Sequence, residues 1–146
     1  ITLDDIAPLD LSKHQYPGLI LYTGFCDEIA KEERNLTGQA KIDFEKKFPA
    51  LSQDAAEYLT RTNPNLSLVG IDSFSFDPQG SNSDAHRVFL EKDILLLETL
   101  VNLSELKRTA GENKFLLYSV PIPYHTADAA QTRAFAITNE PGRRSN

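Results

Sequence analysis

Residues 68–103 read LVGIDSFSFDPQGSNSDAHRVFLEKDILLLETLVNL, and this stretch decides which fold the chain adopts. Two apolar runs, 68–71 and 94–97, flank a polar loop and a short helical pattern. Such alternation is typical of the strand–helix–strand units of an α/β fold. The second run ends on Glu98, and a carboxylate at the end of a buried strand is costly unless a partner pairs with it. A metal ion is one such partner, and His86 is a natural second ligand.

The rest of the chain continues the alternation, so we expect an α/β domain over residues 1–146, with a mixed sheet and flanking helices. The predicted strands are 19–22, 68–71, 94–98, 115–120 and 133–137. The predicted helices begin at Ser52, at Ser83 or Asp84, and at Ser104, and the first of them ends at Asn63-Pro64. Residues 26–48 are predicted to be a loop with one short helix.

Composition limits the function further. The net charge of −6 argues against nucleic acid, which requires a basic face, and against an anionic membrane surface. No apolar run approaches the roughly 20 residues that span a bilayer. The single cysteine, Cys26, excludes a disulfide or a thiolate zinc site within the chain. With no signal peptide visible, we expect a cytoplasmic protein and interpret the sequons at Asn35, Asn65 and Asn102 as chance matches.

His86 and Glu98 form the candidate site with the clearest chemistry. They lie twelve residues apart on two elements joined by a turn near Asp93, and imidazole with carboxylate suits zinc or manganese. Two ligands do not complete a metal site, because structural zinc takes four and catalytic zinc takes three plus water. A salt bridge between the two residues, or a capped histidine, is the alternative from spacing alone.

Two aspartates follow the first apolar run. Asp72 stands at a strand exit, where carboxylates line the sites of open α/β sheets, and it could instead pair with Arg133. Asp77 precedes Pro78, so a turn-forming role is favoured for it.

Other catalytic chemistry has weak support. Ser73 and Ser75 lack the G-x-S-x-G elbow of serine hydrolases, and no Walker A or G-x-G-x-x-G motif occurs. Acidic neighbours favour a structural role for Cys26. His14 and His125 are interpreted as surface residues.

Several pieces of the chain, taken in order, resemble the C-terminal part of the metal-dependent cyclase family, which includes the bacterial kynurenine formamidases. The segment 69–77 is similar to the family's G-I-D-x-x-S-x-D, and 86–103 is similar to its H-x-x-L-L and E-x-L-x-N-L block. The other similar pieces are 21–25 (LYTGF), 48–52 (FPALS) and 121–136.

The resemblance implies a cyclase-type, swivelling β/β/α-like fold that is incomplete at its N-terminus. It implies that His86 and Glu98 bind a divalent metal, zinc or manganese, and that Glu98 bridges two ions. Asp72 is expected to support the site without binding the metal itself. The resemblance also implies hydrolysis of an amide or formamide bond in a small molecule, such as N-formylkynurenine or a cyclic amide.

The chain departs from the family in one respect. The motif H-x-G-T-H-x-D-x-P-x-H, which supplies the family's other metal ligands and a general acid/base histidine, is absent, and the three histidines present cannot build it. No methionine opens the chain. Two interpretations stay open: a piece of a normal enzyme, or a short paralogue that serves binding or assembly. Either way we expect the chain by itself to be inactive and to form homo-oligomers through an exposed apolar face.

Overall fold

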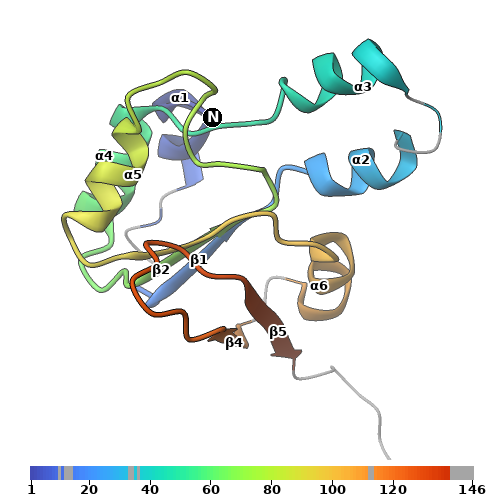
Figure 1. Cartoon of the computed structure of the whole chain (residues 1–146). Coiled ribbons are helices and arrows are strands. Elements are labelled where there is room, and N and C mark those ends of the chain that lie inside the picture. Colours follow the sequence, from blue (N-terminus) through green and yellow to red (C-terminus); the bar gives the residue numbers. More distant parts are fainter. Residues whose placement is uncertain (10, 12–14, 33–34, 36, 112–113, 139–146) are drawn as a thin grey trace, which may run out of the picture. The chain divides into compact units, whose positions relative to one another are not determined.

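The structure, a computed structural model, describes residues 1–9, 11, 15–32, 35, 37–111 and 114–138. The chain divides into two compact units, Ile1–Val101 and Asn102–Asn146. Figure 1 shows their helices and strands, and each unit is described by itself. The expectation of a single domain over residues 1–146 stays a prediction.

The first unit is built on a three-stranded parallel sheet. Its strands, in spatial order, are β1 (Gly18–Leu21), β2 (Leu68–Ile71) and β3 (Leu95–Leu97). The central strand β2 pairs with both neighbours, Gly18 lying opposite Leu68 and Leu68 opposite Leu95. Parallel neighbours require crossover connections, and helices supply them between these strands.

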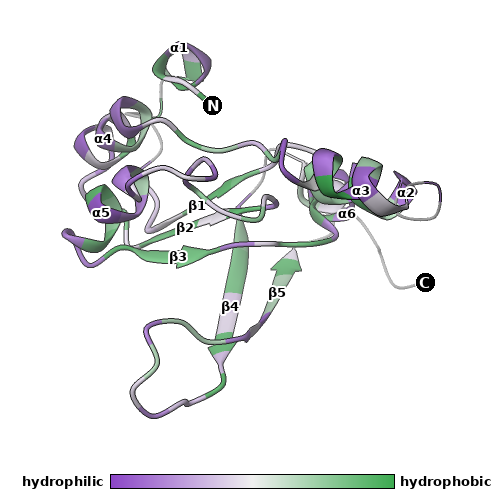
Figure 2. Cartoon of the chain, turned by 45° about the horizontal axis from the view of Figure 1, so that its top comes forward, coloured by the Kyte–Doolittle hydropathy of each residue, from purple (hydrophilic) through white to green (hydrophobic). Residues whose placement is uncertain are grey.

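Helices precede and connect these strands. They are α1 (Leu3–Ile6), the 3₁₀ turn η1 (Ala7–Leu9), α2 (Phe25–Glu32), α3 (Gly38–Glu45), α4 (Gln53–Thr62) and α5 (Asp84–Leu90). Helices α4 and α5 pack side by side. Figure 2 shows their outward sides largely purple, while strands β1 and β3 are largely green. The amphipathic pattern of α4 thus turns its apolar stripe toward the sheet.

One apolar core joins the sheet to α4 and α5. Its buried members come from α1, α4, β2, α5 and the connecting loops: Ile6, Leu51, Ala55, Ala56, Leu59, Leu66, Val69, Ile71, Phe76, Ala85, Phe89 and Ile94. Because Phe76 lies in the loop after β2, the core anchors that loop as well as the regular elements.

The second unit contains α6 (Leu103–Ala110) and an antiparallel pair, β4 (Phe115–Pro121) with β5 (Thr132–Thr138). Helix α6 packs against β5. Cross-strand register places Leu116 opposite Ile137 and Tyr118 opposite Phe135, and the last two rings stack with centroids 4.9 Å apart. We call the exposed side of this pair the hairpin face; its members are Leu116, Tyr118, Val120, Phe135 and Ile137.

Most predicted elements are confirmed. The α/β class holds, with parallel and antiparallel pairing found in two separate sheets of the described residues. Residues 68–71 form β2 as expected, and the helix at Ser52 ends at Asn63. No helix in the described part of the chain is long and apolar enough to cross a membrane.

Two predictions about the elements are wrong. Residues 26–48 contain two helices, α2 and α3, rather than a loop with one short helix. The strand at 94–98 is not buried throughout, because Leu95 is 65% exposed. The physical reason is that successive side chains of a strand point to opposite faces: Leu96 packs against the core, so Leu95 lies on the face away from it.

Candidate metal site

The predicted site residues gather at the carboxyl-terminal edge of the parallel sheet. Thr23 and Gly24 follow β1, Asp72 follows β2 directly, and Glu98 follows β3 directly. This edge is where open α/β sheets bind their ligands, because the loops that leave the strands converge there.

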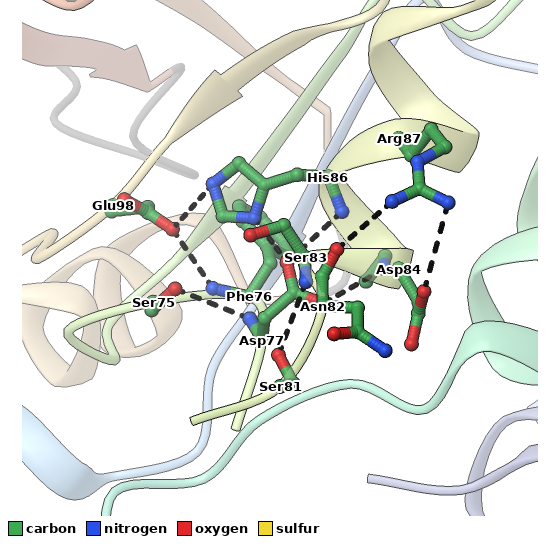
Figure 3. A network of polar contacts seen from close by, with 11 residues as sticks. Ser75, Phe76, Asp77, Ser81, Asn82, Ser83, Asp84, His86, Arg87 and Glu98 are labelled. Carbon is green, nitrogen blue, oxygen red and sulfur yellow. Dashed lines mark hydrogen bonds and ion pairs between the residues drawn. The ribbon is translucent and has the colours of Figure 1, made fainter. Parts of the chain in front are cut away.

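His86 lies between two carboxylates, as Figure 3 shows. Its ring Nδ1 contacts Oδ2 of Asp77, and its Nε2 lies 3.3 Å from Oε1 of Glu98. The ring comes from the first turn of α5, and the two carboxylates come from the loops after β2 and β3. The structure therefore brings His86 and Glu98 together, as both the predicted metal site and the alternative salt bridge require.

The loop after β2 also holds Glu98. The backbone N–H of Phe76 donates to Oε1 of Glu98 at 2.8 Å. The Phe76 side chain is fully buried, and its ring meets the His86 ring edge to face with centroids 6.2 Å apart. Phe76 thus fixes the carboxylate through its backbone and packs against the imidazole through its ring.

Asp77 is the site residue that the sequence analysis missed. It is 6% exposed, and its carboxylate accepts hydrogen bonds from the backbone N–H groups of Ala85 (2.8 Å) and His86 (3.1 Å). Burial raises the pKa of Asp77, but the bonds from His86 and these two N–H groups outweigh it, so the pKa lies below its ordinary value. The turn-former interpretation hid this role because Asp77-Pro78 is also a common turn signal.

The start of α5 is capped differently from the prediction. Ser83 stands at the N-cap position, as one of the two predicted alternatives, but its φ of 58° is left-handed and its side chain makes no cap bond. Asp77, which precedes the helix by seven residues, accepts from the second and third residues of α5 instead.

Asp72 is buried and fully bonded at the neighbouring strand exit. Its carboxylate accepts from Thr23 N (2.8 Å), Thr23 Oγ1 (2.7 Å) and Gly24 N (2.8 Å). Gly24 has a φ of +85°, a conformation that favours glycine. Asp72 therefore ties the exit of β1 to the exit of β2, and its predicted support of a metal site stays a prediction.

Cys26 lies beside this network. Its thiol donates to the backbone oxygen of Asp72 at 2.7 Å. Burial, with the nearby carboxylates of Asp72 and Asp27, raises the pKa of the thiol to about 11. A thiol held neutral in this way is a weak nucleophile, which agrees with the structural role expected from the sequence.

The description of Glu98 as a buried carboxylate is wrong. Its side chain is 31% exposed, because Glu98 lies beyond the last residue of β3 and outside the apolar core. His125 is also exposed, in the loop between β4 and β5, and His14 lies outside the described residues.

The donor geometry fits a shared ion but does not complete a site. Two ligands each about 2.1 Å from a tetrahedral zinc lie about 3.4 Å apart, and Nε2 of His86 is 3.3 Å from Oε1 of Glu98. Within the described ranges, no group of three or more His, Cys, Asp and Glu side chains could hold a metal ion. The two residues by themselves therefore do not complete a coordination sphere.

Sequence comparison finds several relatives, and those reported below are all named kynurenine formamidase. The chain is 34% identical over 93 residues to a kynurenine formamidase of Maricaulis maris, 32% over 98 residues to one of Delftia acidovorans, and 41% over 72 residues to one of Paracidovorax citrulli. These alignments cover 63%, 66% and 49% of this chain and 41%, 44% and 31% of the relatives. The chain thus spans less than half the length of the relatives it matches. No family model matches the sequence.

Solved structures show the same fold. One is described as a potential metal-dependent hydrolase with cyclase activity; it has a TM-score of 0.62 and covers 92% of this chain and 56% of its own. The second is a predicted metal-dependent hydrolase from Bacillus stearothermophilus, with a TM-score of 0.63 and coverages of 92% and 55%. Both are 22% identical to the chain. The chain therefore has the fold of cyclase-type hydrolases and, over part of their length, the sequence likeness to kynurenine formamidases that its motifs predict.

Proposed function

We propose that this chain carries part of the metal centre of a hydrolase that cleaves an amide or formamide bond in a small molecule. His86 and Glu98 are the proposed ligands, and zinc or manganese is the proposed ion. The observation that carries the proposal is the 3.3 Å separation of His86 Nε2 and Glu98 Oε1 at the ligand-binding edge of the sheet. The names of the relatives, kynurenine formamidases, support N-formylkynurenine as the substrate, and a cyclic amide is the proposed alternative.

Each residue has a proposed part. His86 offers a ring nitrogen, and Glu98 offers a carboxylate oxygen that the Phe76 N–H keeps in place. A divalent ion bound there supplies Lewis-acid chemistry, polarising a carbonyl oxygen and lowering the pKa of water. Asp72 is proposed to support the site by holding the neighbouring strand exits together. A general base is not assigned among these residues, so we expect little activity from the 146 residues by themselves.

Metal content tests the proposal directly. Purified chain is loaded with Zn²⁺ or Mn²⁺, dialysed and analysed by mass spectrometry, beside H86A and E98A. We expect bound metal in the wild type and its loss in both variants, whereas H125A, which removes an exposed histidine elsewhere, keeps the metal. Metal retained in full by both H86A and E98A contradicts the proposal, and so does strong formamidase activity that survives H86A.

A second candidate is a non-catalytic short paralogue that acts as a binding or assembly module. The observation that favours it is the hairpin face, whose five apolar side chains are 41–56% exposed. Wild-type chain that binds no metal yet forms a defined oligomer supports this candidate. Homo-oligomer formation and a cytoplasmic location are proposed under either function.

A further inference from the structure

We propose that Asp77 is a positioning residue: its carboxylate holds the His86 ring with the proton on Nδ1, so that the Nε2 lone pair points toward Glu98. The use of that lone pair for a metal ion rests on the proposed function. The orientation of the ring itself does not, because it follows from contacts within this chain.

The carboxylate of Asp77 is fixed relative to the ring. Oδ1 accepts from the N–H of Ala85, and Oδ2 accepts from the N–H of His86 while it contacts the ring Nδ1. Both N–H groups belong to the helix turn that carries the imidazole. A shift of the carboxylate would therefore break backbone bonds as well as the contact with the ring.

The chemistry of the contact sets the position of the proton. A carboxylate only accepts hydrogen bonds, so the ring nitrogen that faces it donates. In a neutral imidazole, one nitrogen carries the proton and the other carries the lone pair. Asp77 is 6% exposed, so little water competes for the contact. Nε2 also faces a carboxylate, but its contact with Glu98 is longer, at 3.3 Å, and the Glu98 side chain is 31% exposed. The closer and more buried contact with Asp77 therefore holds the proton of the neutral ring on Nδ1, and Nε2 is left as the ligand atom.

The same short loop sets the position of the second ligand. Phe76 donates its N–H to Glu98 Oε1, and the next residue, Asp77, holds His86. Because the Phe76 side chain is fully buried in the core, both contacts start from one anchored point. The separation of 3.3 Å between the two candidate ligand atoms is therefore built into the Phe76-Asp77 pair before any ion binds.

This role differs from the one expected for Asp72. Both carboxylate oxygens of Asp72 accept bonds from Thr23 and Gly24, at the exit of β1. A histidine that binds metal commonly donates its other ring N–H to a carboxylate, which fixes the ring and raises its basicity. In this structure, the carboxylate in that position is Asp77.

Nuclear magnetic resonance tests the orientation without any metal. In chain labelled with ¹⁵N-histidine, two-bond ¹H–¹⁵N correlations report which ring nitrogen is protonated, and H86A identifies the signal. At a pH where the ring is neutral, we expect the Nδ1–H form of His86 in the wild type. In D77A, we expect a shift toward the Nε2–H form that free histidine prefers. The control D84A removes a carboxylate from the same helix, and the Nδ1–H form should persist.

A zinc titration adds the functional readout. Removing a carboxylate that supports a metal-binding histidine lowers metal affinity about 10–100-fold, so D77A should lose that much affinity for Zn²⁺ while D84A loses none. Wild-type chain that binds no zinc contradicts the proposed function, yet the tautomer of His86 still decides the role of Asp77. D77A also removes the acceptor that caps α5, so this variant could fail to fold. In that case, the tautomer of His86 in the wild type decides the proposal. An Nε2–H majority in the wild type, or an unchanged tautomer in folded D77A, overturns the proposal.

Discussion

The carboxylate of Asp72 is held by three hydrogen bonds from two consecutive residues, Thr23 and Gly24. It is 1% exposed, so the bonds replace nearly all of its hydration. A buried carboxylate with such donors stabilises the loop that supplies them, and removal of the acceptor leaves the donors without their partner.

Asp72→Ala should therefore lower the free energy of unfolding by about 3 kcal/mol, because buried N–H and O–H donors lose a charged acceptor. Urea unfolding followed by circular dichroism measures the change. The control D84A removes an aspartate whose side chain is 40% exposed, and it should be near neutral. Equal midpoints for the two variants would contradict this role of Asp72.

Cys26 should react slowly in the folded chain. Because burial and the carboxylates of Asp72 and Asp27 raise the pKa of its thiol to about 11, little thiolate is present at neutral pH. We expect alkylation by iodoacetamide to be slow at pH 8, to accelerate with each rise in pH toward 11, and to be much faster at pH 8 in urea. Mass spectrometry of timed samples measures the rate, and equal rates in the folded and unfolded chain at pH 8 would rule the prediction out.

Glycine 70 lies where the central strand meets its neighbours. A Cβ built there would lie 2.5 Å from Cδ1 of Ile20 and 2.7 Å from Cδ1 of Leu100, so both side chains would have to move. Nothing lies within 4 Å of a Cβ built on Gly18, in the adjacent strand. The two glycines therefore form a matched pair for the packing of β1 against β2.

Gly70→Ala should destabilise the fold by about 1–3 kcal/mol through overpacking, whereas Gly18→Ala should change the stability little. Thermal or urea unfolding of the two variants measures the difference. A destabilisation by Gly18→Ala as large as that by Gly70→Ala would show that close packing is not the cause.

How far each element could be predicted depends on how local its signal is. Residues 68–71 form a short apolar run that ends at Asp72, and the strand has those bounds. The helix from 53 to 62 has an N-cap signal at Ser52 and a stop at Asn63-Pro64, and both ends are confirmed. These signals lie within a few residues of the features that they predict.

The segment 26–48 lacks such a signal. The buried anchor of α2 is Phe25, at the first position of the helix, and α3 has no continuous apolar face. The ring centroids of Phe44 and Phe74 lie 6.0 Å and 5.2 Å from that of Phe25. These contacts between distant residues, rather than a local sequence pattern, stabilise the two helices. Tertiary contacts of this kind override local propensity.

Only the part of the candidate site that has a signal in the sequence could be predicted. His86 and Glu98 could be paired from residue type and from likeness to a family, and the structure brings them together. The contact of Asp77 with His86 joins two residues nine positions apart, and spacing does not reveal which way the loop between them folds. The exposure of Glu98 depends on where β3 ends and on what packs around that end, which the residue types at 94–98 do not reveal.

At the scale of the whole molecule, the hairpin face presents five exposed apolar side chains that a second copy of the chain could cover. Its side chains form cross-strand apolar pairs, such as Tyr118 with Phe135, on one side of an antiparallel pair. An identical face on another copy can cover it in a symmetric, self-complementary contact. We therefore expect self-association that depends on concentration.

Phe135→Lys should weaken self-association at least about tenfold, because it places a charge within the apolar face. The control Leu90→Lys makes the same change at an exposed leucine of α5, in the other unit, and should leave association intact. Sedimentation equilibrium measures both variants. A wild-type chain that stays monomeric at every concentration, or equal weakening by the two variants, contradicts this use of the hairpin face.

The central claim is that His86 and Glu98 share one metal ion, and a crystal structure of the Zn²⁺-loaded chain with anomalous diffraction at the zinc edge tests it most directly. We predict a zinc peak about 2.1 Å from Nε2 of His86 and about 2.1 Å from a carboxylate oxygen of Glu98, with Nδ1 still bonded to Asp77. A zinc peak that lies elsewhere, with His86 and Glu98 in direct contact and no ion between them, would contradict the claim.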